Sequence, residues 1–168
     1  LHTATFDAYV NIIDLCLRER VDALLIAGDI FDSADRSLRA QLQFTEGLRR
    51  LDRAGIRSFV CHGNHDPLDG WEPSIRLPDG CHRFGAELSS APVFPDDPDR
   101  AVVHGISYPQ RDVRDNLVPR FAECPPARFS TGLLHANVDN NISHEAYAPC
   151  SKQDLERASM DYWALGHV

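Results

Sequence analysis

Four short apolar runs in the sequence, at residues 21–28, 56–63, 131–134 and 162–166, each end next to side chains that can bind a metal ion. The side chains that follow these runs belong to Asp29, Asn64, His65, Asp66, His135 and His167. Continuous apolar runs of this length are typical of buried strands in an α/β sheet. Ligands of such sheets collect at the carboxyl ends of the strands. We therefore expect these side chains to meet at one rim, as in a binuclear metal centre.

The first two motifs differ in how specific they are. A carboxylate directly after a buried strand suits Asp29 to bridging two cations, although a strand-end Asp also caps a following helix. In Gly63-Asn64-His65-Asp66, the Asn offers a neutral carbonyl oxygen to a metal, and the next residue can aim its imidazole at a substrate. Asp66 is then expected to hold the other nitrogen of that imidazole, so that His65 acts as an acid. The alternative is a plain β-turn, which Asn, Gly and Asp favour regardless of function.

The two remaining candidate ligands, His135 and His167, support a metal centre only when they are considered together with the other motifs. A single His after an apolar run is more often a structural residue than a ligand, but His135 and His167 both stand at strand-end positions, as the first two motifs do. Asp32 is expected at most to hydrogen-bond a metal ligand, without contacting the metal itself. His144 lies in the loop after His135, where either a pocket-lining or a structural role is open.

The elements that must position these residues alternate between helix and strand. Helices are predicted over residues 4–20, 35–54 and, within a longer loop, 113–121, with a capping box at Ser151 and Asp154 opening another. Strands are predicted over residues 22–27, 57–62, 81–84, 91–94, 101–107, 129–135 and 162–165. The strand–helix–strand succession near the start favours parallel neighbours and an α/β fold.

Composition limits the class of protein. The 168 residues suffice for one domain with a core, and no apolar stretch approaches the roughly 20 residues of a membrane span. The five cysteines are scattered and form no C-x-x-C pair, which indicates reduced thiols and a cytoplasmic protein. A net charge of −8 argues mildly against non-specific tracking of DNA, although bound cations would reverse the local field.

The motifs Gly28-Asp29-x-x-Asp32, Gly63-Asn64-His65-Asp66, His135 and Gly166-His167 resemble, in order and spacing, those of the calcineurin-like metallophosphoesterases. A narrower match, at residues 134–141, 144–150 and 161–168, resembles the YhaO-like branch of bacterial DNA repair exonucleases, which are relatives of the SbcD nuclease.

The resemblance implies a role for each motif residue. Asp29 would bridge both metals, Asn64, His135 and His167 would complete one ion site, and His65, oriented by Asp66, would act as the acid or transition-state stabiliser. The other ion site in such enzymes needs an Asp-x-His motif on an earlier strand and a second His after the one that matches His167. Both are expected outside these 168 residues, as is the C-terminal remainder, so residues 1–168 are expected to be a partial phosphoesterase domain.

The fold implied by the resemblance is a four-layer α/β/β/α sandwich of two mixed sheets, without its first strand. The implied activity is two-metal hydrolysis of phosphodiester bonds by a DNA repair exonuclease. The expected cofactors are two divalent ions, with Mn²⁺ favoured over Fe or Zn. DNA and an SMC-like ATPase are the expected partners, and a homodimer is left open. Two alternatives stand beside this hypothesis: a phosphatase or phosphodiesterase of small molecules or phosphoproteins, and a non-catalytic scaffold for the ATPase.

Overall fold

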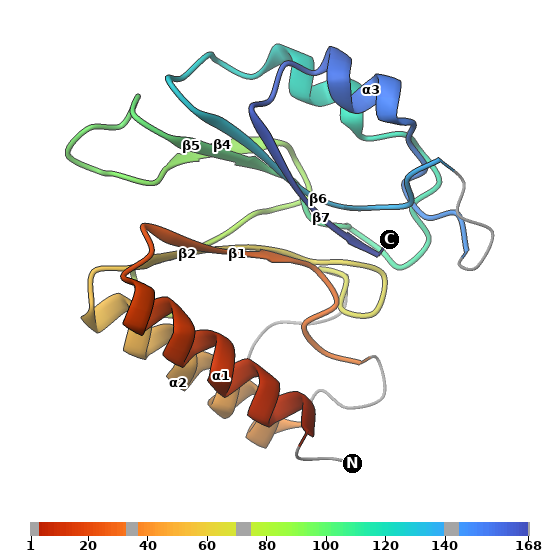
Figure 1. Cartoon of the computed structure of the whole chain (residues 1–168). Helices are drawn as coiled ribbons and strands as arrows, with labels where there is room; N and C mark the ends of the chain where they lie inside the picture. Colours follow the sequence, from red (N-terminus) through yellow and green to blue (C-terminus); the bar gives the residue numbers. More distant parts are fainter. Residues whose placement is uncertain (1–3, 33–36, 70–74, 140–144, 168) are drawn as a thin grey trace.

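The computed structural model describes residues 4–32, 37–69, 75–139 and 145–167 (Figure 1). The helices are α1 (Ala4–Glu19), α2 (Leu38–Arg53), the 3₁₀ helix η1 (Val118–Glu123) and α3 (Lys152–Arg157). The strands are β1 (Ala23–Ala27), β2 (Arg57–Cys61), β3 (Cys81–Arg83), β4 (Ser89–Pro92), β5 (Val102–Gly105), β6 (Ser130–Ala136) and β7 (Tyr162–His167).

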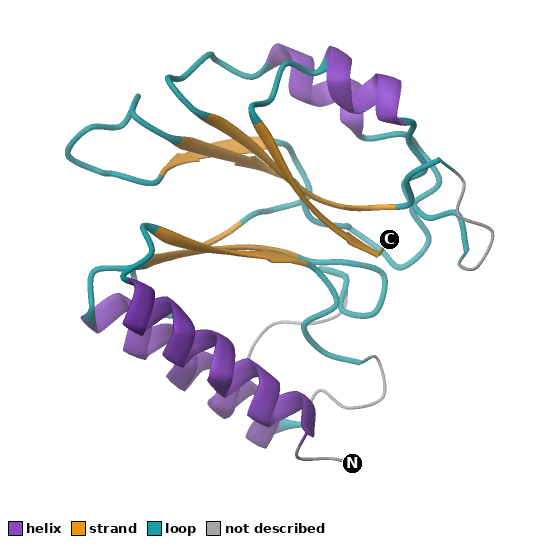
Figure 2. Ribbon diagram, in the orientation of Figure 1, coloured by secondary structure: helices purple, strands orange, loops and turns teal. Residues whose placement is uncertain are grey.

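Two sheets lie face to face with helices on both outer sides, as the side view in Figure 2 shows. One sheet has the strand order β1-β2-β3 and is parallel throughout its described strands. The other has the order β4-β5-β6-β7, in which β4 is antiparallel to β5 and the remaining pairs are parallel. The predicted four-layer α/β/β/α sandwich is thereby confirmed, with the mixture of strand directions confined to the four-stranded sheet.

The space between the sheets is filled by apolar side chains from both. Phe59 of β2 and Leu133 of β6 are fully buried there, together with Phe84 and Val103. Leu134 points to the other face of its sheet and joins the cluster beneath η1 and α3. Because side chains alternate along a strand, His135 then falls on the same inward face as Leu133.

Helices α1 and α2 cover the outer face of the three-stranded sheet. The Tyr9 hydroxyl of α1 donates a hydrogen bond to the backbone oxygen of Phe44 in α2, at 2.7 Å. The close approach depends on Gly47, where a Cβ would collide with the Tyr9 ring. Ile13 and Leu51 are fully buried between these helices and the sheet.

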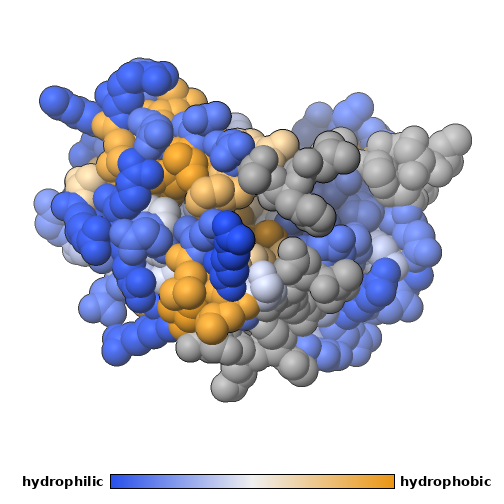
Figure 3. All heavy atoms as spheres, turned by 90° about the horizontal axis from the view of Figure 1, so that it is seen from below, coloured by the Kyte–Doolittle hydropathy of each residue, from blue (hydrophilic) through white to orange (hydrophobic). Residues whose placement is uncertain are grey.

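The solvent side of these helices is mixed in character. Figure 3 views the molecule from this side and shows apolar areas among hydrophilic ones. The exposed large apolar side chains on the two helices are Ile12, Leu15, Leu38 and Leu42.

The layer above the four-stranded sheet shows one confirmed and one displaced element. Ser151 and Asp154 form the predicted capping box, with the Ser151 hydroxyl and the Asp154 carboxylate each accepting a backbone N–H bond. The helix predicted at 113–121 is instead a 3₁₀ helix at Val118–Glu123 with Pro119 in its first turn. A proline has no N–H to give to a helix interior, so the helix can only begin near it.

Two further features bear on the environment of the protein. All five cysteines are free thiols, as predicted. Among the described residues, no helix is both long and apolar enough to span a bilayer.

Candidate metal centre

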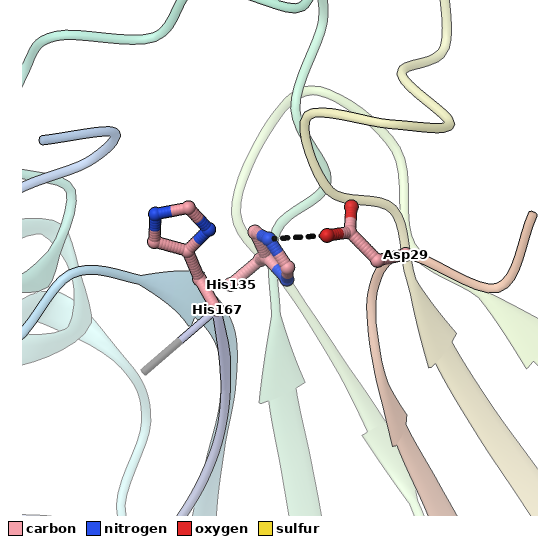
Figure 4. A group of neighbouring side chains, drawn as sticks. All are labelled: Asp29, His135 and His167. Carbon is pink, nitrogen blue, oxygen red and sulfur yellow. Dashed lines mark ion pairs between the residues drawn. The ribbon is translucent and has the colours of Figure 1, made fainter. Parts of the chain in front are cut away.

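Three side chains from both sheets meet where strands β1, β6 and β7 end. Each of Asp29, His135 and His167 offers one nitrogen or oxygen ligand atom, and these atoms all lie within 4.8 Å of one another (Figure 4). Asp29 follows β1 on a loop, whereas His135 and His167 belong to the strands β6 and β7 themselves. The strand at 129–135 was predicted to include His135, whereas β7 extends two residues beyond the predicted 162–165 and includes His167.

His135 is the most constrained of the three. It is 1% exposed, and its Nδ1 lies 2.8 Å from the backbone oxygen of Ala27 in the opposite sheet. A carbonyl only accepts, so Nδ1 carries a proton, and in the neutral form of the ring the lone pair is then on Nε2. That Nε2 lies 3.0 Å from Oδ1 of Asn64 and 3.3 Å from Oδ2 of Asp29. Three electron-pair donors thus converge on one point, which is the arrangement that a cation stabilises.

The glycines around this point keep the space open. A Cβ on Gly63 would meet Oδ1 of Asp29 and the His135 ring, and a Cβ on Gly28 would meet the same ring. Gly28 also has a φ of +85°, which side-chain-bearing residues rarely adopt. Both glycines are therefore required by close approach, and Gly28 is required by its backbone conformation as well.

Like His135, His167 has one ring nitrogen hydrogen-bonded to a backbone oxygen. Its Nε2 lies 2.9 Å from the backbone oxygen of Glu145, so Nε2 donates and Nδ1 is left with the lone pair. Figure 4 shows a ring nitrogen of His167 turned toward His135 and Asp29. Hydrogen bonding of the second nitrogen to a carbonyl is typical of histidines that bind metals, because it fixes the tautomer.

Two of the three clustered residues have a strained backbone. Asp29 has a φ of +51° and His167 a φ of +76°. In a regular extended strand, side chains alternate between the two faces, so His167 would lie on the face opposite to Gly166. The positive φ of His167 interrupts the extended backbone on which this alternation depends. Strain of this kind costs of order 1–3 kcal/mol per residue and clusters at functional sites.

The Asp29 carboxylate is held in its ionised form. Its side chain is 30% exposed, and Oδ1 accepts a bond from the backbone N–H of His65 at 3.0 Å. Burial alone would raise the pKa of Asp29, but the contact with His135, the His65 N–H and the positive charge that the two imidazoles carry when protonated outweigh burial and lower that pKa. The carboxylate is thus available to a cation without first losing a proton.

Asp66 has a different place from the one predicted. It is fully buried, and its carboxylate accepts backbone N–H bonds from Gly63 at 2.8 Å, Asp29 at 3.1 Å and Ile30 at 2.9 Å. Buried N–H groups need acceptors, and this carboxylate satisfies three of them. Asp66 therefore connects the loop after β1 to the loop after β2 by hydrogen bonds and fixes the backbone around the site.

The contact expected of Asp66 is made by Asp32. Nδ1 of His65 lies 3.3 Å from Oδ1 of Asp32, and the His65 side chain is 43% exposed at the rim. The sequence indicated a supporting role at most for Asp32, and the structure makes it the carboxylate beside the His65 imidazole.

Other participants had no signal in the sequence. The carbonyls of Ala27 and Glu145 hold the two histidine rings, but any residue type can supply a backbone oxygen. His144, the further pocket-lining candidate, lies outside the described residues.

The geometry agrees with what the chain resembles. Residues 1–168 match the family model described as calcineurin-like phosphoesterase. The chain belongs to that family. It is 39% identical over 167 residues to the "uncharacterized metallophosphoesterase YhaO" of Bacillus subtilis, an alignment covering 98% of this chain and 41% of the relative.

Two further proteins, one named for DNA repair and one named as a nuclease subunit, are also similar to this chain. The DNA double-strand break repair protein Mre11 of Aeropyrum pernix is 31% identical over 185 residues, covering 97% of this chain and 42% of that protein. A component of the SbcCD nuclease of Rhodobacter capsulatus is 39% identical over 83 residues, covering 47% of this chain and 20% of that protein. The chain spans about two fifths of the length of the first two relatives.

The donor set fits the divalent cations that this family binds. A carboxylate oxygen, an amide oxygen and two imidazole nitrogens from Asp29, Asn64, His135 and His167 form a mixed oxygen and nitrogen set. Such a set suits Mn²⁺, Fe²⁺ and Zn²⁺ better than the all-oxygen environments of Mg²⁺ or Ca²⁺.

Proposed function

We propose that this phosphoesterase hydrolyses phosphodiester bonds in DNA as a metal-dependent exonuclease. The observation that carries the proposal is the convergence of lone pairs from Asp29, Asn64 and His135 on one point, with His167 alongside. A structural cluster would pair donors with acceptors, whereas this one gathers acceptors when the His135 ring is in its neutral form.

The ligands divide between two ion sites in this proposal. Asn64, His135 and His167 would hold one ion, Asp29 would serve both sites, and the remaining ligands of the second site would come from outside residues 1–168. Two divalent ions, Mn²⁺ for preference, would activate water and neutralise charge on the phosphoryl oxygens.

The chain's own acid is His65. Its exposed ring stands at the rim beside the cluster while its backbone N–H binds Asp29, so the imidazole is anchored close to the reacting phosphate without being needed as a ligand. Asp32 holds the proton on Nδ1 and orients the ring, and Nε2 is then directed to the oxygen that leaves. General acid catalysis of this kind is worth roughly 10²–10⁴ in rate.

DNA as substrate is supported by similarity. The names of the Mre11 and SbcCD relatives state a DNA repair role for the first and a nuclease role for the second. An SMC-like ATPase is proposed as the partner on the resemblance of the sequence motifs to the YhaO-like branch. The second candidate, a phosphodiesterase of small molecules, is favoured by the net charge of −8, which does not suit a polyanionic substrate.

The test measures metal content and substrate preference on the same purified protein. After incubation with Mn²⁺ and removal of excess metal, bound metal is measured by mass spectrometry in the wild type and in Asp29→Asn. A linear DNA duplex and a small chromogenic phosphodiester are then offered as substrates. Cleavage of the DNA that Asp29→Asn abolishes would support the nuclease, and cleavage of the small diester alone would favour the second candidate. Absence of bound metal in the wild type would overturn both.

A further inference from the structure

A short segment after β6 is packed against the outer side of His167. The backbone oxygen of Glu145 accepts the hydrogen bond from His167 Nε2 at 2.9 Å, and it also accepts the backbone N–H of Tyr147 at 2.8 Å. The Tyr147 ring meets the His167 ring nearly edge-on, with centroids 5.7 Å apart. The orientation of His167 therefore depends on where residues 145–147 lie.

One side chain from a distant loop fixes that segment. The guanidinium of Arg114 lies over the Tyr147 ring, 4.8 Å from its centroid, and its Nη2 lies 3.3 Å from the carboxylate of Glu145. Its Nε contacts Asp112 in its own loop. Nearby, the backbone N–H of Ala148 donates to the oxygen of Val113 at 2.8 Å, which joins the two segments next to Arg114.

The chemistry of arginine suits this position. A planar guanidinium can stack on an aromatic ring and still donate in its own plane to a carboxylate, which a lysine ammonium cannot do. Hydrogen bonding from Tyr147 and then from Arg114 lowers the pKa of the Glu145 carboxyl, so the partner of Arg114 is ionised. These contacts constrain Glu145 and Tyr147 together.

We propose that Arg114 is a positioning residue for His167: it holds residues 145–147 so that the Glu145 carbonyl keeps the proton on Nε2 and leaves Nδ1 for a divalent cation. The inference rests on the metal centre proposed above. It gives a role to Arg114, which belongs to none of the sequence motifs.

The test is the affinity for Mn²⁺, measured by calorimetry on the metal-free protein, with the absorption spectrum of bound Co²⁺ as a second readout. Loss of a partner that orients a metal ligand typically weakens binding 10–100-fold. We expect Arg114→Gln to bind Mn²⁺ about tenfold more weakly and to change the Co²⁺ spectrum, because His167 is then free to turn. Glu145→Gln, a milder change at an exposed side chain, should weaken binding in the same direction.

Controls separate this inference from folding effects and from the proposed function. Arg18→Gln, which removes the same charge from an exposed side chain of α1, should leave the affinity and the spectrum unchanged. Thermal unfolding of the metal-free variants establishes that they are folded. If Asp29→Asn abolishes metal binding while Arg114→Gln and Glu145→Gln both bind as the wild type does, the role of Arg114 is overturned and the metal centre stands. If Asp29→Asn binds metal like the wild type, the metal centre itself is overturned.

Discussion

His135 reaches across the interface between the two sheets: its Nδ1 donates a hydrogen bond to the backbone oxygen of Ala27, 2.8 Å away. The same ring presents Nε2 to Asn64 and Asp29. One imidazole therefore both joins the sheets and offers a lone pair to the site, which couples the stability of the sandwich to the geometry of the metal centre.

This coupling predicts two separate effects of His135→Ala. Metal binding should be lost, because the ligand and its fixed tautomer are both removed. The metal-free protein should also be less stable by about 2 kcal/mol, since a buried hydrogen bond and the packing of a buried ring disappear. Metal titration and urea unfolding of the metal-free protein measure the two effects. A variant that loses metal with unchanged metal-free stability would show that the bond to Ala27 contributes nothing to the fold.

His65→Ala is predicted to separate catalysis from metal binding. Turnover should fall roughly 10²–10⁴-fold, because the acid is removed. Metal affinity should stay close to that of the wild type, because alanine retains the backbone N–H that binds Asp29. Steady-state kinetics and metal titration on the same preparation check this.

Replacement of Asp32, the partner of His65, should have a smaller effect of the same kind. Asp32→Asn should cost about tenfold in turnover, less than His65→Ala, because the ring loses its orienting carboxylate but keeps its chemistry. Loss of metal from the His65→Ala variant would mean that His65 is a ligand, and the role proposed for it would be wrong.

The sequence predicted the positions of the rim residues well because strand ends are marked by hydrophobicity. Asp29, His135 and His167 follow or end apolar runs, and parallel strands of a sheet must end at one edge. The structure brings these three together, while their roles as ligands stay predictions. The bounds of β4 were predicted less well: the strand lies at 89–92 rather than at 91–94. Its sequence, Ser-Ser-Ala-Pro, has little of the apolar pattern that marks a strand.

The exchange of roles between Asp66 and Asp32 could not be predicted in this way. Asp66 is adjacent to His65 in sequence, but the turn directs its carboxylate inward to backbone N–H groups. Asp32 is 33 residues away along the chain and faces the ring across two loops. Which carboxylate meets the imidazole is decided by the turn geometry, and residue types leave that geometry open.

Gly166 is predicted to be indispensable. A Cβ at this position would overlap the backbone oxygen of Ala27 and press on the His135 ring. Gly166→Ala should therefore destabilise the protein by about 2 kcal/mol or more and weaken metal binding, because the sheets must separate. The matched control is Gly85→Ala, where an added Cβ meets no atom within 4 Å, and its stability should stay within about 0.5 kcal/mol of the wild type. Thermal unfolding of both variants measures the difference. Equal stabilities would show that the sheets accommodate the added Cβ without loss of stability.

Asp66→Ala should act on the fold before it acts on chemistry. Removal of a buried carboxylate leaves three backbone N–H groups without their acceptor, which costs about 3 kcal/mol or more. Urea unfolding with an unchanged slope measures this loss, and the exposed neighbour Asp69→Ala serves as control. A stability like that of the wild type, combined with a large loss of turnover, would instead restore the catalytic role first expected for Asp66.

The ionisation of Asp29 predicts a pH dependence of the metal-free protein. The pKa of Asp29 is lower in the folded state than its ordinary value near 4. Its ionised form therefore stabilises the fold above that ordinary value, and this contribution disappears as the pH falls through the lower, folded value. The difference in unfolding free energy between wild type and Asp29→Asn should shrink steadily as the pH falls below about 4. Chemical unfolding of both proteins in chelator across this range tests it. A difference that grows on acidification would mean that burial outweighs the His135 and His65 contacts, and that the free carboxylate is not held ready for a cation.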